Sequence, residues 1–225
     1  MKKILALAAV IFFITSNTSV RAQEKIHEGK IRFEMTFPDT GQSSYLFEMM
    51  PKEMIVWFKD GDTRTEMQTG RGKIAMLRYA KSKDMYTLMN MKGEKIALKM
   101  NKDLMERFKD SLKSKKAEII VTDETKTIAF FKCRKAIATM MFRGEKKSVE
   151  VWFTKEIDNL DLGEYKVEGI DGFVMEMNIA DKGLNVHMLC TSIERMNVPE
   201  SLIKIPEDYK VMSMDDLARD RDKDR

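Results

Sequence analysis

Apolar and polar residues alternate along most of the chain beyond residue 28. In the segment "GKIRFEMTF" (29–37) every second residue is apolar, and these residues are Ile31, Phe33, Met35 and Phe37. A period of two with one apolar side is typical of an antiparallel strand that buries one face. The same pattern predicts further strands at 45–50, 54–58, 63–67, 73–79, 85–91, 94–100, 127–131, 135–142, 148–154, 172–179 and 184–193.

Short turn signals separate these strands, among them Asp60-Gly61 and Lys92-Gly93, so the pattern predicts a meander of hairpins. One segment differs. In "NKDLMERFKDSLKS" (101–114) the apolar residues recur at helical spacing after Asn101, which is a suitable N-cap. The chain is therefore predicted to be mainly antiparallel β with one amphipathic helix.

The stretch "EGIDGFVMEM" (168–177) holds two glycines three positions apart, as some phosphate-binding loops do. A glycine loop binds phosphate when it opens a helix, whose free N–H groups and dipole hold the anion. Here Gly172 leads into alternating residues instead, with Phe173, Met175 and Met177 on one face. The pattern predicts a turn that feeds a strand.

The first 22 residues have the pattern of a secretory signal peptide. Lys2 and Lys3 precede an apolar run at 4–14, and "SVRA" ends at a suitable cleavage site after Ala22. The run is shorter than the roughly 20 residues that a membrane span needs. We therefore expect a signal peptide at 1–22, one domain at 23–212 without a transmembrane segment, a charged C-terminal tail at 213–225, and a periplasmic or secreted location.

Removing residues 1–22, which include Lys2, Lys3 and Arg21, takes the formal charge from +4 to +1. Basic and acidic residues are interleaved along the rest of the chain, whereas a nucleic-acid interface needs a basic patch. Nucleic acid is therefore not an expected partner.

The chain has two cysteines, Cys133 and Cys190, and both fall in predicted strands. In an oxidising compartment they have two alternatives, a disulfide or two buried free thiols that pack as small apolar residues. They are too few and too far apart for a metal site of the usual spacing.

Candidate catalytic groups are scarce. The two histidines are His27, close to the cleavage site, and His187, which an odd separation places on the opposite strand face from Cys190. A hydrolytic site needs a nucleophile and a base within reach of one another. We expect no enzymatic activity and no cofactor.

Several segments resemble one family. "VWFTKEI" (151–157) followed by "GIDGFVMEM" (169–177) resembles the secreted Bacteroidetes family catalogued as domain of unknown function 4412, and is similar to a related group named for a Gly-Leu-Pro-Gly-Leu-Ile motif. Asp171 stands where that group has proline, which favours the first family. Supporting segments are "MPKEMIVWFKDGDTRTEM" (50–67), "FFKCRKAIATM" (130–140) and "VPESLIKIPEDYKVM" (198–212).

The resemblance implies a curved antiparallel half-barrel, similar to the lipoprotein carriers LolA and LolB, with a helix against its concave side. The family has no established reaction, so it supplies no catalytic residue.

Methionine is the outstanding feature of the composition, with 20 residues. Its flexible thioether suits surfaces that accept ligands of varied shape. On the concave side of a half-barrel, such residues would form a trough for a lipid, a hydrophobic small molecule or the acyl part of an envelope lipoprotein. The candidate lining residues are Phe33, Met35, Met54, Val56, Met89, Phe173, Met175 and Met177, with Leu104 and Phe108 of the predicted helix as a lid.

Other interpretations of the same residues remain open. The methionines are equally well explained as ordinary core. Thioethers also bind Cu(I), and "MNM" (89–91), "MEM" (175–177) and "MSM" (212–214) place sulfur at every second residue. A third interpretation is an envelope protein that binds a partner chain along a sheet edge. A continuous cavity would favour a lipid ligand. Converging sulfur atoms would favour copper, and a filled core with an open sheet edge would favour a partner chain.

Overall fold

The structure is a computed structural model, which describes residues 25–38, 48, 50–70, 72–91, 93–100, 118–142, 145–181 and 184–223. The described strands are β1 (Glu28–Thr36), β2 (Glu53–Lys59), β3 (Asp62–Thr69), β4 (Gly72–Arg78), β5 (Met85–Met91), β6 (Glu94–Lys99), β7 (Glu118–Ile128), β8 (Phe131–Phe142), β9 (Glu145–Thr154), β10 (Phe173–Asp181), β11 (Leu184–Arg195) and β12 (Lys210–Ser213). The described helices are short: η1 (Gly163–Tyr165), α3 (Glu200–Ile203) and α4 (Met214–Lys223).

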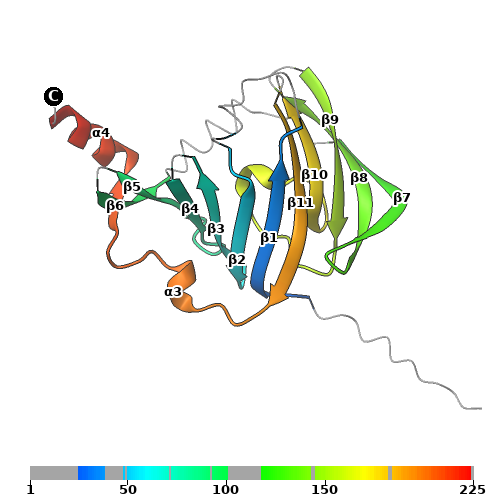
Figure 1. The fold of residues 1–225 in the computed structure, drawn as a ribbon, viewed down its shortest axis with the longest axis horizontal. Coiled ribbons are helices and arrows are strands. Elements are labelled where there is room, and N and C mark those ends of the chain that lie inside the picture. The colour runs from blue at the N-terminus through cyan, green and yellow to red at the C-terminus, as the bar shows by residue number, and fades with distance from the viewer. Residues whose placement is uncertain are drawn as a thin grey trace, which may run out of the picture.

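All these strands form one sheet, in the spatial order β12-β6-β5-β4-β3-β2-β1-β11-β10-β9-β8-β7. Neighbouring strands are antiparallel, except that β12 lies parallel to β6. The pairing of β1 with both β2 and β11 joins the two halves of the chain in the middle of the sheet. The sheet is open and curved, with β7 at one edge and β12 at the other (Figure 1).

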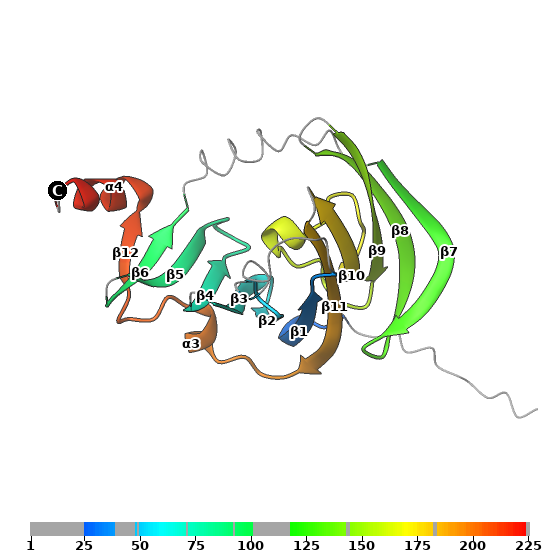
Figure 2. The ribbon, with the colours of Figure 1, turned by 45° about the horizontal axis from the view of Figure 1, so that its top comes forward.

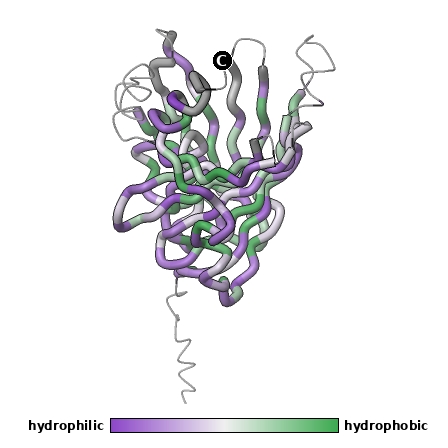
Figure 3. The backbone as a smooth tube through the Cα atoms, turned by 90° about the vertical axis from the view of Figure 1, so that its left-hand side faces the viewer, coloured by the Kyte–Doolittle hydropathy of each residue, from purple (hydrophilic) through white to green (hydrophobic). Residues whose placement is uncertain are grey.

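The main core lies on the inner side of the curve. Ile31, Phe33 and Met35 of β1 are buried there while the residues between them are not, because side chains alternate across a strand. Along the strands, hydrophobic and hydrophilic positions alternate (Figure 3). A smaller cluster of Ala75, Leu77, Leu88 and Ala97 packs against the segment that contains Ile205 and Tyr209.

The period of two predicted most strands correctly, including β1 to β6 and β8 to β11 within a few residues. The predicted strand at 127–131 is wrong, because Ala129 and Phe130 form the turn between β7 and β8. Strand β7 begins at Glu118, where the alternation predicted no element, and β12 was also missed. The expected charged tail at 213–225 is mostly helix α4.

Some predictions fall outside the described residues. These are the signal peptide at 1–22, the helix at 101–114 with Leu104 and Phe108, and most of the strand at 45–50. The structure does show one mainly antiparallel, curved sheet. The closer likeness to LolA and LolB remains a prediction.

Candidate functional site

The structure brings most of the predicted lining residues together. Phe33, Met35, Met54, Val56, Phe173, Met175 and Met177 all belong to one buried cluster on the inner side of the sheet, which we call the inner cluster. Strand pairing places Phe33 opposite both Met54 and Cys190. Each of the seven side chains is at most 3% exposed, so they are packed as a core rather than open to solvent as a trough.

Met89 is placed elsewhere and corrects the prediction for that residue. It is half-buried on β5 and packs against a separate small cluster of Ile96, Leu98 and Met212. The reason is its place in the sheet, because β6 and β12 lie beyond β5 on that side and carry the residues of the small cluster.

A long connection fills the inner side of the curve. Strands β9 and β10 are antiparallel neighbours, yet residues 155–172, which we call the β9–β10 loop, join them by way of the inner face. The loop and η1 lie between β2–β3 and β9–β10 (Figure 2). Its buried apolar side chains are Ile157, Leu160, Leu162, Val167 and Ile170.

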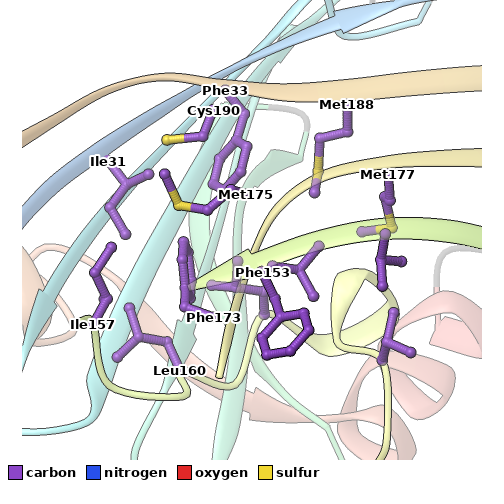
Figure 4. Packing of buried hydrophobic residues seen from close by; sticks show 14 of the residues in the cluster. Ile31, Phe33, Phe153, Ile157, Leu160, Phe173, Met175, Met177, Met188 and Cys190 are labelled. Atoms are coloured by element: carbon purple, nitrogen blue, oxygen red, sulfur yellow. The ribbon is translucent and has the colours of Figure 1, made fainter. Parts of the chain in front are cut away.

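The loop packs closely against the sheet. Ile157 and Leu160 lie beside Ile31 and Phe173 (Figure 4). The rings of Phe33 and Phe173 pack at a tilt of 45°, with their centroids 6.0 Å apart. A cavity of about 10 Å³, lined by residues that include Leu160, Val167 and Phe173, has room for about one water molecule.

Polar contacts hold the loop at several points, including a β-bridge between Ile26 and Ile157 and a contact between the His27 ring and the Asp158 carboxylate. At its base the Lys155 ammonium lies 2.5 Å from the Asp171 carboxylate and lowers the pKa of Asp171, although both side chains are exposed. The Asn159 side-chain amide donates to the Ile170 carbonyl at 3.2 Å. Arg78 of β4 lies 3.9 Å from the Asp161 carboxylate. The loop is therefore held by backbone and ionic contacts as well as by its apolar side chains.

Two glycines let the loop approach the sheet. Gly163 has φ +68°, and a Cβ there would lie 2.0 Å from the Arg78 guanidinium. Gly172 ends the turn at 168–172, and a Cβ there would lie 2.5 Å from the Thr154 carbonyl oxygen. The glycines of "GIDG" thus serve a turn that feeds β10, as the sequence predicted, and no helix follows them.

Cys133 and Cys190 are free, buried thiols. Of the two alternatives for them, the structure therefore has two packed thiols and not a disulfide. Burial raises the pKa of Cys133 to about 11 and that of Cys190 to about 12. A buried, protonated thiol is a poor nucleophile and a poor metal ligand. Neither cysteine supports a thiol mechanism.

This burial predicts slow thiol chemistry and an alkaline loss of stability. Unfolded thiols ionise near pH 9.0, whereas the folded ones keep their protons to about pH 11–12, so stability should fall as pH rises through this interval. We expect Ellman's reagent at pH 8 to react much faster with urea-unfolded than with folded protein. Urea unfolding across pH 8–11 should show a shallower pH slope for Cys133→Ala/Cys190→Ala, and an equal slope would contradict the account.

The methionine pairs proposed as copper ligands lie in two clusters. Met175 and Met177 are in the inner cluster, whereas Met89 and Met212 share the small cluster with Ile96, and Met214 is exposed. Within the described part of the chain, no group of three or more His, Cys, Asp and Glu side chains is arranged to hold a metal ion.

The outer side of the sheet carries a charged network that the sequence did not reveal. Glu176 forms an ion pair with Lys126 and lies 3.3 Å from the His187 ring. The Lys126 ammonium also lies 4.3 Å from the centre of the Trp152 ring. These contacts join strands β7, β9, β10 and β11. His187 takes part in them through its contact with the Glu176 carboxylate.

No family model matches the chain, and no curated protein matches it. Among solved structures, the chain is similar to the crystal structure of LprF from Mycobacterium bovis, with 11% sequence identity and a TM-score of 0.36, over 80% of this chain and 90% of that one. A likeness of this degree carries no argument about function. No helix in the described residues is both long and apolar enough to cross a membrane. The comparisons therefore place the chain in no family.

Proposed function

We propose that the protein is a non-enzymatic binding protein of the periplasm or the extracellular space. Its ligand would be a long hydrophobic chain, such as the acyl chain of a lipid or of an envelope lipoprotein. The hydrophobic chain of the ligand would lie on the inner face of the sheet, where the β9–β10 loop now lies.

One observation supports this proposal above the others. Adjacent antiparallel strands can be joined by a turn of two residues, but β9 and β10 are joined through residues 155–172. Loops of this length with little regular structure are uncommon in compact domains and are often functional. This loop places an apolar segment on the inner face, and the ion pair of Lys155 and Asp171 at its base is exposed to solvent. In the proposed function this segment is a removable occupant.

The energies set the size of the ligand. Burying five apolar side chains of the loop contributes about 7–15 kcal/mol at about 1.5–3 kcal/mol each. A ligand that displaces them gains about 0.8 kcal/mol per buried methylene. Palmitate would gain about 11 kcal/mol and octanoate about 5 kcal/mol at this rate, so short chains should not displace the loop.

The inner face is also chemically adaptable. Met35, Met188 and Met177 lie opposite one another on three successive strands, and Met54 and Met67 do so on two others. Unbranched thioether side chains repack around occupants of different shape at low cost. A face of this kind can accept either the loop or an acyl chain.

The proposal is tested with palmitate as the probe and octanoate as its short-chain control. We expect native mass spectrometry of the mature chain to retain palmitate with one-to-one stoichiometry and not octanoate. Absence of a palmitate complex, or equal binding of palmitate and octanoate, would contradict the proposal.

A further inference from the structure

The tip of the β7–β8 hairpin presents a single aromatic side chain to solvent. Phe130 is 99% exposed, whereas its neighbours Ile128 and Phe131 are 6% and 9% exposed. The hairpin lies at the outer edge of the sheet (Figure 1). A lone, fully exposed phenylalanine contributes nothing to the packing of the core.

The backbone at this tip is strained. Ala129 has φ +46° and Phe130 has φ +71°, and together they make the two-residue connection between β7 and β8. Such turns favour Asn-Gly or Asp-Gly, because positive φ crowds a Cβ against the backbone. The β2–β3 hairpin of the same chain follows this rule with Asp60-Gly61 at φ +50° and +88°.

The tip is also held rigidly. Ile128 and Phe131 pair across the hairpin and are both part of the inner cluster. The Lys132 backbone N–H donates to the Glu156 carboxylate at 3.3 Å, which ties the hairpin to the base of the β9–β10 loop. The backbone that carries the ring is therefore fixed before binding, which lowers the conformational entropy lost on binding.

From the strain, the exposure and the rigidity we infer that Phe130 is the anchor of a protein–protein interface. Its partner is a protein with an apolar pocket that accepts one phenyl ring. Buried aromatic anchors of this kind are typical hot spots of protein interfaces. The inference does not depend on the proposed hydrophobic ligand.

A membrane surface fits the tip less well. Stable attachment to a membrane takes two signals, such as an inserted apolar group and a basic patch. At this end of the molecule charges are balanced: Lys155 pairs with Asp171 at 2.5 Å, and Asp158 lies 2.5 Å from His27 and 3.9 Å from Lys25. The partner's pocket should therefore have an uncharged rim, and binding should depend little on salt.

The test is photo-crosslinking from position 130 in cells that produce the full chain. We would place p-benzoylphenylalanine at Phe130, and at Thr127, an exposed position of the same hairpin, as control. We expect one discrete protein adduct from 130 and none from 127. Absence of an adduct from 130 would overturn the inference.

Binding of the identified protein then decides whether the ring is the anchor. In purified form, it should bind the wild type and Thr127→Ala alike, and Phe130→Ala at least about tenfold more weakly. Equal affinity for Phe130→Ala would show that the ring is not a binding site and would contradict the inference. Sedimentation with phosphatidylglycerol vesicles that depends on Phe130 would contradict it in favour of a membrane site.

A stability measurement separates binding from folding. Ala129→Asn together with Phe130→Gly gives the favoured turn sequence, so this variant should melt about 3 °C higher than the wild type while losing the partner. A lower melting temperature would show that Phe130 serves the fold and would overturn the inference.

Discussion

Met175→Asp is expected to prevent folding. Met175 is 0% exposed in the inner cluster, beside Phe33, Phe173 and Cys190 (Figure 4). A carboxylate there would lose its hydration and find no cation among these apolar neighbours. The cost should exceed about 5 kcal/mol, which is a large part or all of the stability of a typical domain. Circular dichroism and urea unfolding of the purified variant measure it.

Met175→Leu is the matched control, because it keeps the volume and the apolar character of the side chain. It should cost less than about 1.5 kcal/mol. If Met175→Asp instead folds and unfolds at the urea midpoint of the wild type, the inner face is open to water and the packed core described above is incorrect.

Leu160→Ala should lower stability and at the same time tighten palmitate binding. Leu160 is 3% exposed and packs from the β9–β10 loop onto the inner cluster. Its truncation should destabilise the ligand-free protein by about 2–5 kcal/mol. In the proposed complex the loop has already left the inner face, so the same truncation costs the complex little. The affinity should rise at least tenfold, since a factor of ten corresponds to about 1.4 kcal/mol.

Leu88→Ala is the control for this effect. Leu88 is 2% exposed but belongs to the cluster with Ala75, Leu77 and Ala97, away from the loop. It should destabilise the protein similarly and leave the palmitate affinity unchanged, both measurable by urea unfolding and titration calorimetry. Unchanged or weaker binding by Leu160→Ala would show that the loop is a permanent part of the core.

The inner cluster shows how far alternation can predict a site. The period of two correctly placed Phe33 and Met35 on one face, and Phe173 and Met177 on another strand of the same face. Alternation fixes which side chains share a face. It does not show whether that face meets solvent, a ligand or another part of the chain, because all three require apolar side chains.

The β9–β10 loop could not be predicted in the same way. Its apolar residues at 157, 160, 162, 167 and 170 follow neither the strand period nor the helix period. The β7–β8 turn was missed because Ala129-Phe130 carries none of the usual turn residues and instead extends an apparent strand. In both places the conformation of the chain departs from the one that its local sequence favours. Both places also carry a functional proposal.

Hydrogen–deuterium exchange with and without palmitate tests the central claim most directly, namely that the β9–β10 loop occupies the place of a ligand. Native mass spectrometry of the same samples would establish that palmitate is bound. The account predicts faster exchange of residues 155–172 in the complex, because the loop leaves the sheet, with β1 and β10 as well protected as before. Unchanged or slower exchange of residues 155–172 in the palmitate complex would contradict it.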